Sequence, residues 1–184
     1  YGKKFYGPST LRKGIEKSRN LMTVRVAQNL GFKKIASISK NLGIYDSTPE
    51  LLSVSLGSNE TTLLKLTSAY STFVNGGKKI NPKMIKRIQD RIGKTIYNSE
   101  DRSCSGCDIF LEQNKQNLKI LDKKQQIISP ETAYQITSML EGAVKRGTGK
   151  KLKSLNVPLA GKTGTTNDNF DAWFIGYTSE LVIG

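Results

Sequence analysis

The feature that most constrains the fold is a set of strand-like segments near the C-terminal end of the chain. An apolar lead-in over residues 157–161 precedes a short polar segment, residues 162–166, and a second apolar run follows over residues 171–177. Two apolar runs on either side of a short polar segment are typical of an antiparallel strand pair. We therefore expect strands over residues 157–165, 170–178 and 180–184, with the polar segment at the lip of a sheet.

The polar segment has a composition suited to binding a carboxylate. It combines the cation of Lys162 with the hydroxyls of Thr163 and Thr165, and Gly164 lies between them. Glycine has no side chain to block a ligand that comes close to the backbone. A Lys-Thr-Gly sequence also occurs by chance, however, and its other interpretation is a polar turn between strands. On its own the segment leaves both interpretations open.

Composition excludes several kinds of catalytic site within this chain. The 184 residues contain no histidine, which excludes a Ser-His-Asp triad, a Cys-His site and a histidine-based zinc site here. Two cysteines alone cannot complete a tetrahedral zinc site. A hydroxyl nucleophile would need lysine, aspartate or glutamate as its base. We expect no metal and no other cofactor.

The length suits one ordinary domain or a part of a larger one. The chain begins at Tyr1 without a signal-peptide pattern, and no apolar run is as long as a membrane span. The last residues, 180–184, have a strand-like pattern that stops within the element. We interpret the chain as a fragment of a longer protein.

The net charge of +14 and the pI of about 9.8 allow two interpretations. One is an anionic partner, such as nucleic acid, a membrane surface or a cell-wall polymer. The other is a solvated, lysine-rich surface. The lysines occur as scattered pairs, without the dense basic block and interleaved aromatic residues of a nucleic-acid-binding surface. We favour the second interpretation and expect no nucleic-acid partner.

Apolar spacing and glycine stops divide the remaining chain into elements. Residues 9–30 predict two helical pieces, capped by Ser9 or Thr10 and ended by Gly31. Further helices are expected over residues 32–42, over 62–75 and from Ser129-Pro130 to Gly147. A hairpin is expected over residues 83–98, and a polar loop or insert over 99–127.

Cys104 and Cys107 form a Cys-Ser-Gly-Cys sequence within that insert. In a reducing compartment such a pair suggests redox or metal chemistry. No βαβ pattern surrounds it, which argues against a thioredoxin-like role. In an oxidising compartment a local disulfide would fix the insert, and we favour this structural interpretation.

Ser18 and Asn20 lie two residues apart at the expected junction of the N-terminal helical pieces. On a turn, a hydroxyl can relay a proton, and an amide offers both a donor and an acceptor to an amide substrate. The same spacing occurs at residues 39–41 and 154–156, so an isolated match carries little weight.

The order of the motifs gives them weight together. Ser-x-x-Lys, Ser-x-Asn and Lys-Thr-Gly are the signature of β-lactamases and penicillin-binding proteins. The chain resembles the C-terminal part of the transpeptidase domain of class A (bifunctional) penicillin-binding proteins, over nearly all of residues 1–184. Four blocks carry the resemblance: residues 6–25 around Ser18-Arg19-Asn20, residues 56–77 ending in Asn75-Gly76-Gly77, residues 128–149 ending in Gly147-Thr148-Gly149, and residues 160–177 with Lys162-Thr163-Gly164.

The resemblance implies a mixed α/β (α+β) fold, in which helices flank an antiparallel sheet, truncated here at both ends. It also implies a serine acyltransferase that cross-links peptidoglycan stem peptides. In that family a serine attacks the D-Ala-D-Ala amide, releases the last D-Ala and passes the acyl group to an amine of a neighbouring stem. β-Lactam antibiotics acylate the same serine.

For the longer protein the resemblance implies an N-terminal glycosyltransferase domain, a membrane anchor and a location at the periplasmic face of the bacterial inner membrane. A β-lactamase or penicillin sensor of the same fold is the closest alternative. A basic, non-enzymatic binding module for an anionic polymer is the alternative from another class.

The resemblance also implies roles for individual residues. Ser18 would relay a proton to or from the leaving amine, and Asn20 would bind the substrate's amide. Lys162 would attract the terminal carboxylate and, as a neighbouring cation, lower the pKa of nearby amines. Thr163 and Thr165 would hydrogen-bond the carboxylate, and the backbone N–H of Thr165 would be an oxyanion donor.

One motif of the family is absent from its usual place. The catalytic Ser-x-x-Lys precedes Ser-x-Asn in the family, but no such sequence precedes Ser18. A literal match at residues 37–40 follows Ser18 within an expected helix, and we interpret it as chance. We therefore expect the nucleophile and its lysine base in a missing N-terminal part, and we expect this chain alone to be inactive.

Overall fold

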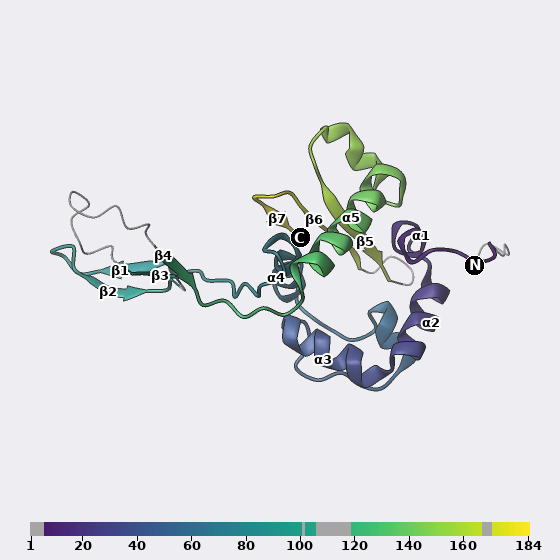
Figure 1. The fold of residues 1–184 in the computed structure, drawn as a ribbon, viewed down its shortest axis with the longest axis horizontal. Coiled ribbons are helices and arrows are strands. Elements are labelled where there is room, and N and C mark those ends of the chain that lie inside the picture. The colour runs from purple at the N-terminus through teal and green to yellow at the C-terminus, as the bar shows by residue number, and fades with distance from the viewer. Residues whose placement is uncertain (1–5, 101, 106–118, 167–170) are drawn as a thin grey trace. The chain divides into compact units, whose positions relative to one another are not determined.

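The computed structural model describes residues 6–100, 102–105, 119–166 and 171–184. The chain forms two compact units (Figure 1). The first comprises residues 1–80 and 126–184, and the second comprises residues 81–125. Each unit has its own helices or strands.

Three helices begin the first unit. The predicted break in the N-terminal helical region is confirmed, as is the predicted end of the third helix at Gly43. The Thr10 hydroxyl caps the first helix by accepting a hydrogen bond from the backbone N–H of Lys13. Gly31 and Gly43 follow the second and third helices with φ of 84° and 76°, which glycine adopts without steric cost. The helices are α1 (Leu11–Glu16), α2 (Asn20–Leu30) and α3 (Phe32–Leu42).

Two longer helices follow close to their predicted ranges. The first of them, α4, is capped by Thr62, and the second, α5, by Ser129, with Pro130 at its first position. Two 3-10 helices of the first unit were not predicted, because their sequences are short and lack a helical apolar period. The helices are α4 (Leu63–Val74) and α5 (Pro130–Arg146), and the 3-10 helices are η1 (Leu52–Leu56) and η2 (Lys150–Leu155).

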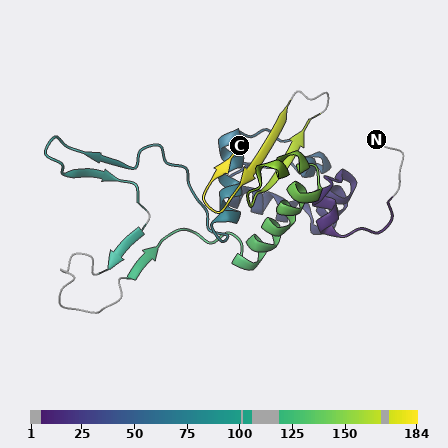
Figure 2. The same cartoon turned by 90° about the horizontal axis from the view of Figure 1, so that it is seen from above.

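A three-stranded antiparallel sheet completes the first unit. Its order is β5 (Ala160–Thr165), β6 (Ala172–Tyr177) and β7 (Val182–Ile183). The strands are shorter than the predicted ranges, and the register pairs Ala160 with Tyr177 and Thr165 with Ala172. Helix α5 packs against β5, as Figures 1 and 2 show.

The core of the first unit forms where α4 and α5 meet the sheet. Leu140, Ala160 and Tyr177 are buried at its centre. The ring of Tyr70 contacts those of Phe73 and Tyr177 edge-on, with centroids 5.6 and 6.4 Å apart. The predicted apolar face of α5 is the one that enters this core, which fixes the position of β5.

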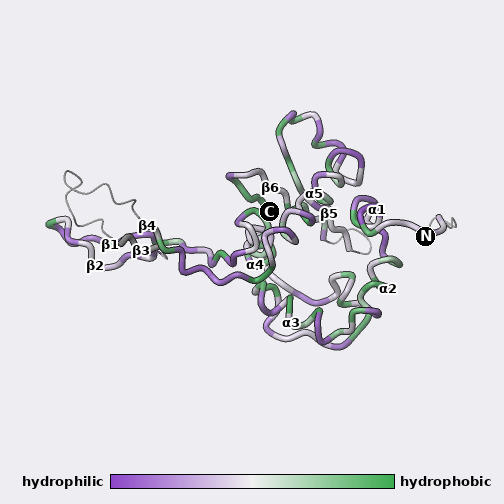
Figure 3. The backbone as a smooth tube through the Cα atoms, viewed as in Figure 1, coloured by the Kyte–Doolittle hydropathy of each residue, from purple (hydrophilic) through white to green (hydrophobic). Residues whose placement is uncertain are grey.

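The second unit consists of short strand pairs. The predicted hairpin is confirmed as β1 (Arg87–Gln89) and β2 (Thr95–Asn98). The Asp90 carboxylate closes its turn by accepting hydrogen bonds from the backbone N–H groups of Ile92 and Lys94, at 3.0 and 2.9 Å. Every residue of both strands is exposed. Their backbone is coloured mainly hydrophilic, with a hydrophobic patch at the turn (Figure 3).

A second strand pair corrects the expectation of a loop over residues 99–127. Strand β3 (Arg102–Ser105) pairs antiparallel with β4 (Lys119–Asp122). Each strand is only four residues long, which is too short to show a period of two, so the pattern gave no signal. Cys104 lies on β3, whereas Cys107 lies outside the described residues. Their disulfide and the bounds of the insert therefore stay predictions.

Candidate active site

The structure brings together two of the predicted motifs. Lys162, on β5, donates a hydrogen bond from Nζ to Oγ of Ser18 over 2.8 Å. A second bond runs from Nζ to the carbonyl oxygen of Thr163, at 2.7 Å. The two motifs are 144 residues apart in sequence. Their meeting places a hydroxyl beside a cation on β5, an outer strand of the described sheet.

Ser18 lies on a tight turn between α1 and α2. Its φ is 51°, in the left-handed region. Its N–H donates to the carbonyl of Ile15, at 3.1 Å, and the N–H of Arg19 donates to that of Gly14, at 2.9 Å. A left-handed non-glycine residue costs roughly 1–2 kcal/mol, and such strain is common at functional sites. The turn presents the exposed Ser18 side chain toward Lys162.

Lys162 is a partly buried cation, and its burial lowers its pKa from the ordinary lysine value. Among the described residues no carboxylate forms an ion pair with it. Its two recorded acceptors, a hydroxyl and a carbonyl, are neutral. No described carboxylate neutralises this positive charge, and it can attract an anion.

The neighbouring hydroxyl of Thr163 has a partner that the sequence did not indicate. Oγ1 of Thr163 is hydrogen-bonded to Oγ1 of Thr148 at 2.8 Å. Thr148 lies just after α5, in the Gly-Thr-Gly sequence. The motif was visible in the sequence, but the contact of its threonine with β5 depends on the packing of α5 against that strand.

The remaining predicted residues lie nearby in the fold without joining this network. Gly164 is exposed on β5, and a Cβ there would approach only the carbonyl oxygen of Trp173, at 4.0 Å. Thr165 is exposed at the end of the strand. Asn20 is the exposed first residue of α2, and within the described part of the chain its side chain has no recorded hydrogen bond to Ser18 or Lys162. Their roles stay predictions.

An ion pair between the buried carboxylate of Glu16 and the exposed guanidinium of Arg146 anchors the Ser18 turn to α5. The carboxylate of Glu16, only 5% exposed, accepts hydrogen bonds from Nε and Nη2 of Arg146 at 3.0 and 2.5 Å. Gly142 makes room for it, because a Cβ there would lie 2.0 Å from Oε1 of Glu16. This pair was not predicted, since 130 residues separate its partners. It fixes the end of α1 on the same helix that supports β5.

The chance match at residues 37–40 has no part in this arrangement. Ser37 and Lys40 are exposed on α3, which packs against α2. No hydrogen bond between either residue and Lys162 or Ser18 is recorded among the described residues. The structure therefore gives no support for Ser37 as a nucleophile.

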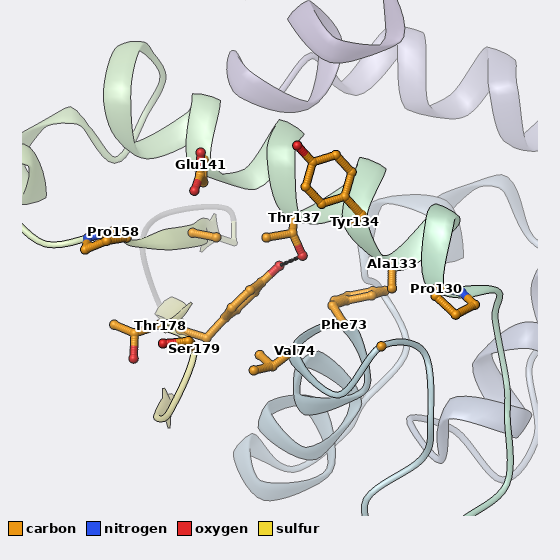
Figure 4. Close-up of a pocket in the computed structure, with 13 residues that line it drawn as sticks. Phe73, Val74, Pro130, Ala133, Tyr134, Thr137, Glu141, Pro158, Thr178 and Ser179 are labelled. Carbon is orange, nitrogen blue, oxygen red and sulfur yellow. Dashed lines mark hydrogen bonds between the residues drawn. The ribbon is translucent and has the colours of Figure 1, made fainter.

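The first unit also has a cavity of about 380 Å³ (Figure 4), and neither Lys162 nor Ser18 is among the residues that line it. Phe73, Val74 and Tyr134 contribute to its lining. The hydroxyls of Thr137 and Tyr177 face each other there, 2.9 Å apart (Figure 4). Burial raises the pKa of Tyr177, so its phenol stays protonated at neutral pH. The cavity offers no activated nucleophile, and the Lys162 network remains the better candidate.

The described residues contain no group of three or more metal-ligating side chains of the His, Cys, Asp or Glu type. Within the same residues, no helix combines the length and the apolar character needed to cross a membrane.

Comparison with known proteins identifies close relatives of the whole chain. The family model of the penicillin binding protein transpeptidase domain matches residues 1–180. Penicillin-binding protein 1A of Rickettsia bellii is 46% identical over 188 residues, covering 100% of this chain and 24% of that protein. The corresponding protein of Pseudomonas aeruginosa is 36% identical over 209 residues, covering 97% of this chain and 25% of its own length.

Solved structures agree with this similarity. The crystal structure of penicillin-binding protein 1A from Haemophilus influenzae matches with a TM-score of 0.80 and 30% identity, over 97% of this chain and 30% of that one. The expected mixed α/β fold, with helices on an antiparallel sheet, is confirmed. The chain spans about a quarter of the length of the curated relatives it matches.

Proposed function

We propose that this chain, which belongs to the penicillin-binding protein transpeptidase domain family, forms one side of the active site of a peptidoglycan D,D-transpeptidase. The observation that carries the proposal is the 2.8 Å hydrogen bond from Lys162 to Ser18. It joins the Lys-Thr-Gly strand to the Ser-x-Asn turn, as a site built from both motifs requires. A non-enzymatic binding module, which the net charge allowed as an alternative, would leave this contact unexplained.

The nucleophilic serine and its lysine base belong, in this proposal, to a part of the longer protein outside these 184 residues. The serine attacks the D-Ala-D-Ala carbonyl and gives its proton to the base. Because Ser18 accepts a hydrogen bond from Lys162, its own proton is free to be donated. Ser18 gives that proton to the leaving amine as the C–N bond breaks, and it regains one from the base.

Lys162 and its neighbours hold the substrate's terminal carboxylate in this scheme. The un-neutralised cation attracts the anion, and Thr163 and Thr165 donate hydrogen bonds to it, next to the open backbone of Gly164. The backbone N–H of Thr165 stabilises the oxyanion of the tetrahedral intermediate. Asn20, at the start of α2, would bind the substrate's amide after the substrate enters.

For the longer protein we propose the bifunctional organisation of the family. This includes a glycosyltransferase domain, a membrane anchor and a location at the periplasmic face of the inner membrane. The identity to penicillin-binding proteins 1A supports a biosynthetic enzyme over a β-lactamase or a sensor. Its ligands are peptidoglycan stem peptides and β-lactams, and this chain by itself is inactive.

Acylation of the full-length protein by fluorescent penicillin tests the proposal. We expect Lys162→Ala to reduce the acylation rate by about 100- to 1,000-fold, a loss as large as that of one oxyanion-hole donor. The matched control is Lys65→Ala, on α4, whose ammonium pairs with Asp46 at 3.0 Å. This control should acylate at the wild-type rate.

Two results would contradict the proposal. One is a full-length wild-type protein that forms no covalent adduct with penicillin. The other is a Lys162→Ala variant that is acylated as fast as the Lys65→Ala control.

A further inference from the structure

We propose that Thr148 is a positioning residue that directs the Thr163 hydroxyl toward the substrate's carboxylate. The inference rests on the proposed function, because it concerns the same carboxylate site. It assigns a role to a hydroxyl on the loop after α5, which neither motif of the site includes.

The backbone of Thr148 is fixed from the opposite side of the site. Its N–H donates a hydrogen bond to the carbonyl oxygen of Glu16, at 3.2 Å. The adjoining Gly147 and Gly149 are buried, whereas Thr148 is exposed. A Cβ at Gly147 would lie 2.2 Å from the same Glu16 carbonyl, so glycine is required for this close approach. Thr148 is therefore held by the segment that leads into Ser18.

The side chain of Thr148 makes the second connection, to β5. Its Oγ1 lies 2.8 Å from Oγ1 of Thr163. One residue thus connects the Ser-x-Asn turn through its backbone and the Lys-Thr-Gly strand through its hydroxyl. The two halves of the site are linked here independently of the Lys162–Ser18 bond.

The direction of the hydroxyl pair follows from its protons. Each threonine hydroxyl has one proton to donate and can accept at its oxygen. An ionised carboxylate only accepts, so Thr163 must use its proton on the substrate. Thr148 must then donate to Thr163. This chain of bonds orients the Thr163 hydroxyl and polarises it, which strengthens its bond to the anion.

Acylation by two β-lactams in the full-length protein separates this role from a structural one. Benzylpenicillin carries the carboxylate, and its methyl ester lacks the negative charge. We expect Thr148→Val to lower the acylation rate about tenfold for the acid, because losing the bond that orients the Thr163 hydroxyl costs about as much as one ordinary hydrogen bond. For the ester we expect a change of less than about threefold, since its hydrogen bond is not charge-assisted.

Three further variants complete the test. Thr148→Ser keeps the hydroxyl and should restore most of the rate for the acid. Thr95→Val, an exposed position on β2, is the matched control and should match the wild type. The double variant Thr148→Val/Thr163→Val should be no slower than Thr163→Val alone, because Thr148 acts through Thr163.

Equal losses for acid and ester, additive losses in the double variant, or no rescue by serine would overturn the inference. If the wild type is acylated by neither compound, the proposed function fails and this inference fails with it. If the wild type is acylated normally and Thr148→Val loses the same factor for the acid and the ester, the inference fails while the proposed function stands.

Discussion

The hairpins β1–β2 and β5–β6 are both antiparallel strand pairs, but they differ in how far their side chains are buried and in whether a helix covers them. Every residue of β1 and β2 is exposed, whereas β6 ends in the buried sequence Ile175-Gly176-Tyr177. Helix α5 covers β5, and its loop supplies Thr148 to the strand. Backbone pairing alone is therefore enough to form a strand. The side chains of β5 are held in place because α5 packs against that strand.

This difference predicts that equivalent substitutions will lower the free energy of unfolding more in the unit that contains β5–β6 than in the unit that contains β1–β2. The largest difference should come from glycine. A Cβ at Gly147 would lie 2.2 Å from the Glu16 carbonyl oxygen and 2.7 Å from the Cα of Ala143, so backbone must move. We expect Gly147→Ala to lower the free energy of unfolding by about 4 kcal/mol or more, in the exceptional range for one substitution.

The matched change is Gly93→Ala, in the turn of β1–β2. Its φ is 84°, but a Cβ there would have nothing within 4 Å. The cost is then only that of a left-handed alanine, about 1 kcal/mol. Thermal unfolding of the two full-length variants, with their soluble yields, provides the measurement. A smaller loss for Gly147→Ala than for Gly93→Ala would break the comparison.

A second pair of variants tests the strands themselves. Ile175 on β6 is 3% exposed, and Ile96 on β2 is 68% exposed. We expect Ile175→Thr to cost about 2–4 kcal/mol, because it removes buried apolar volume and adds a buried hydroxyl. Ile96→Thr should stay within about 0.5 kcal/mol. Chemical denaturation of each variant measures both values, and similar losses would show that the exposed hairpin has a packing partner.

The smallest effect is confined to alkaline pH. Burial raises the pKa of Tyr70 in the core to about 12, from 10.0 for a free tyrosine. The folded state therefore keeps the proton longer than the unfolded state. The contribution of the Tyr70 phenol to the free energy of unfolding is complete below pH 10.0. It is lost as the pH rises toward 12, and the total loss is about 2–3 kcal/mol.

Removing that phenol should flatten the alkaline loss of stability. We expect Tyr70→Phe to show a weaker fall in thermal stability over this pH interval than the wild type. Tyr97→Phe, on the exposed strand β2, is the control and should behave as the wild type. Equal alkaline slopes in the wild type and in Tyr70→Phe would refute the assignment.

The sequence predicted those elements whose signals are local. Thr10 and Ser129 begin helices and Gly43 ends one, because each acts through hydrogen bonds or dihedral angles within a few residues. The β5–β6 pair was predicted from its two apolar runs. The β3–β4 pair and the two 3-10 helices were not predicted, because their short segments carry no recognisable period.

The candidate site divides in the same way. Ser18 and Lys162 were predicted as residues, and the structure adds the bond between them. The contacts of Thr148 with Thr163 and of Glu16 with Arg146 were not predicted, because they depend on where α5 packs. A single sequence states which groups exist, but long-range packing decides which of them meet.

The left-handed turn at Ser18 has a consequence for how this position can vary. With φ at 51°, glycine would hold the same backbone at lower cost than serine. Selection for stability alone would therefore favour glycine at this position. The proposed proton relay requires the hydroxyl and so favours serine. The residue at this position therefore distinguishes relatives. Serine indicates that the proton-relay function is kept, and glycine would indicate a relative that keeps the fold without that function.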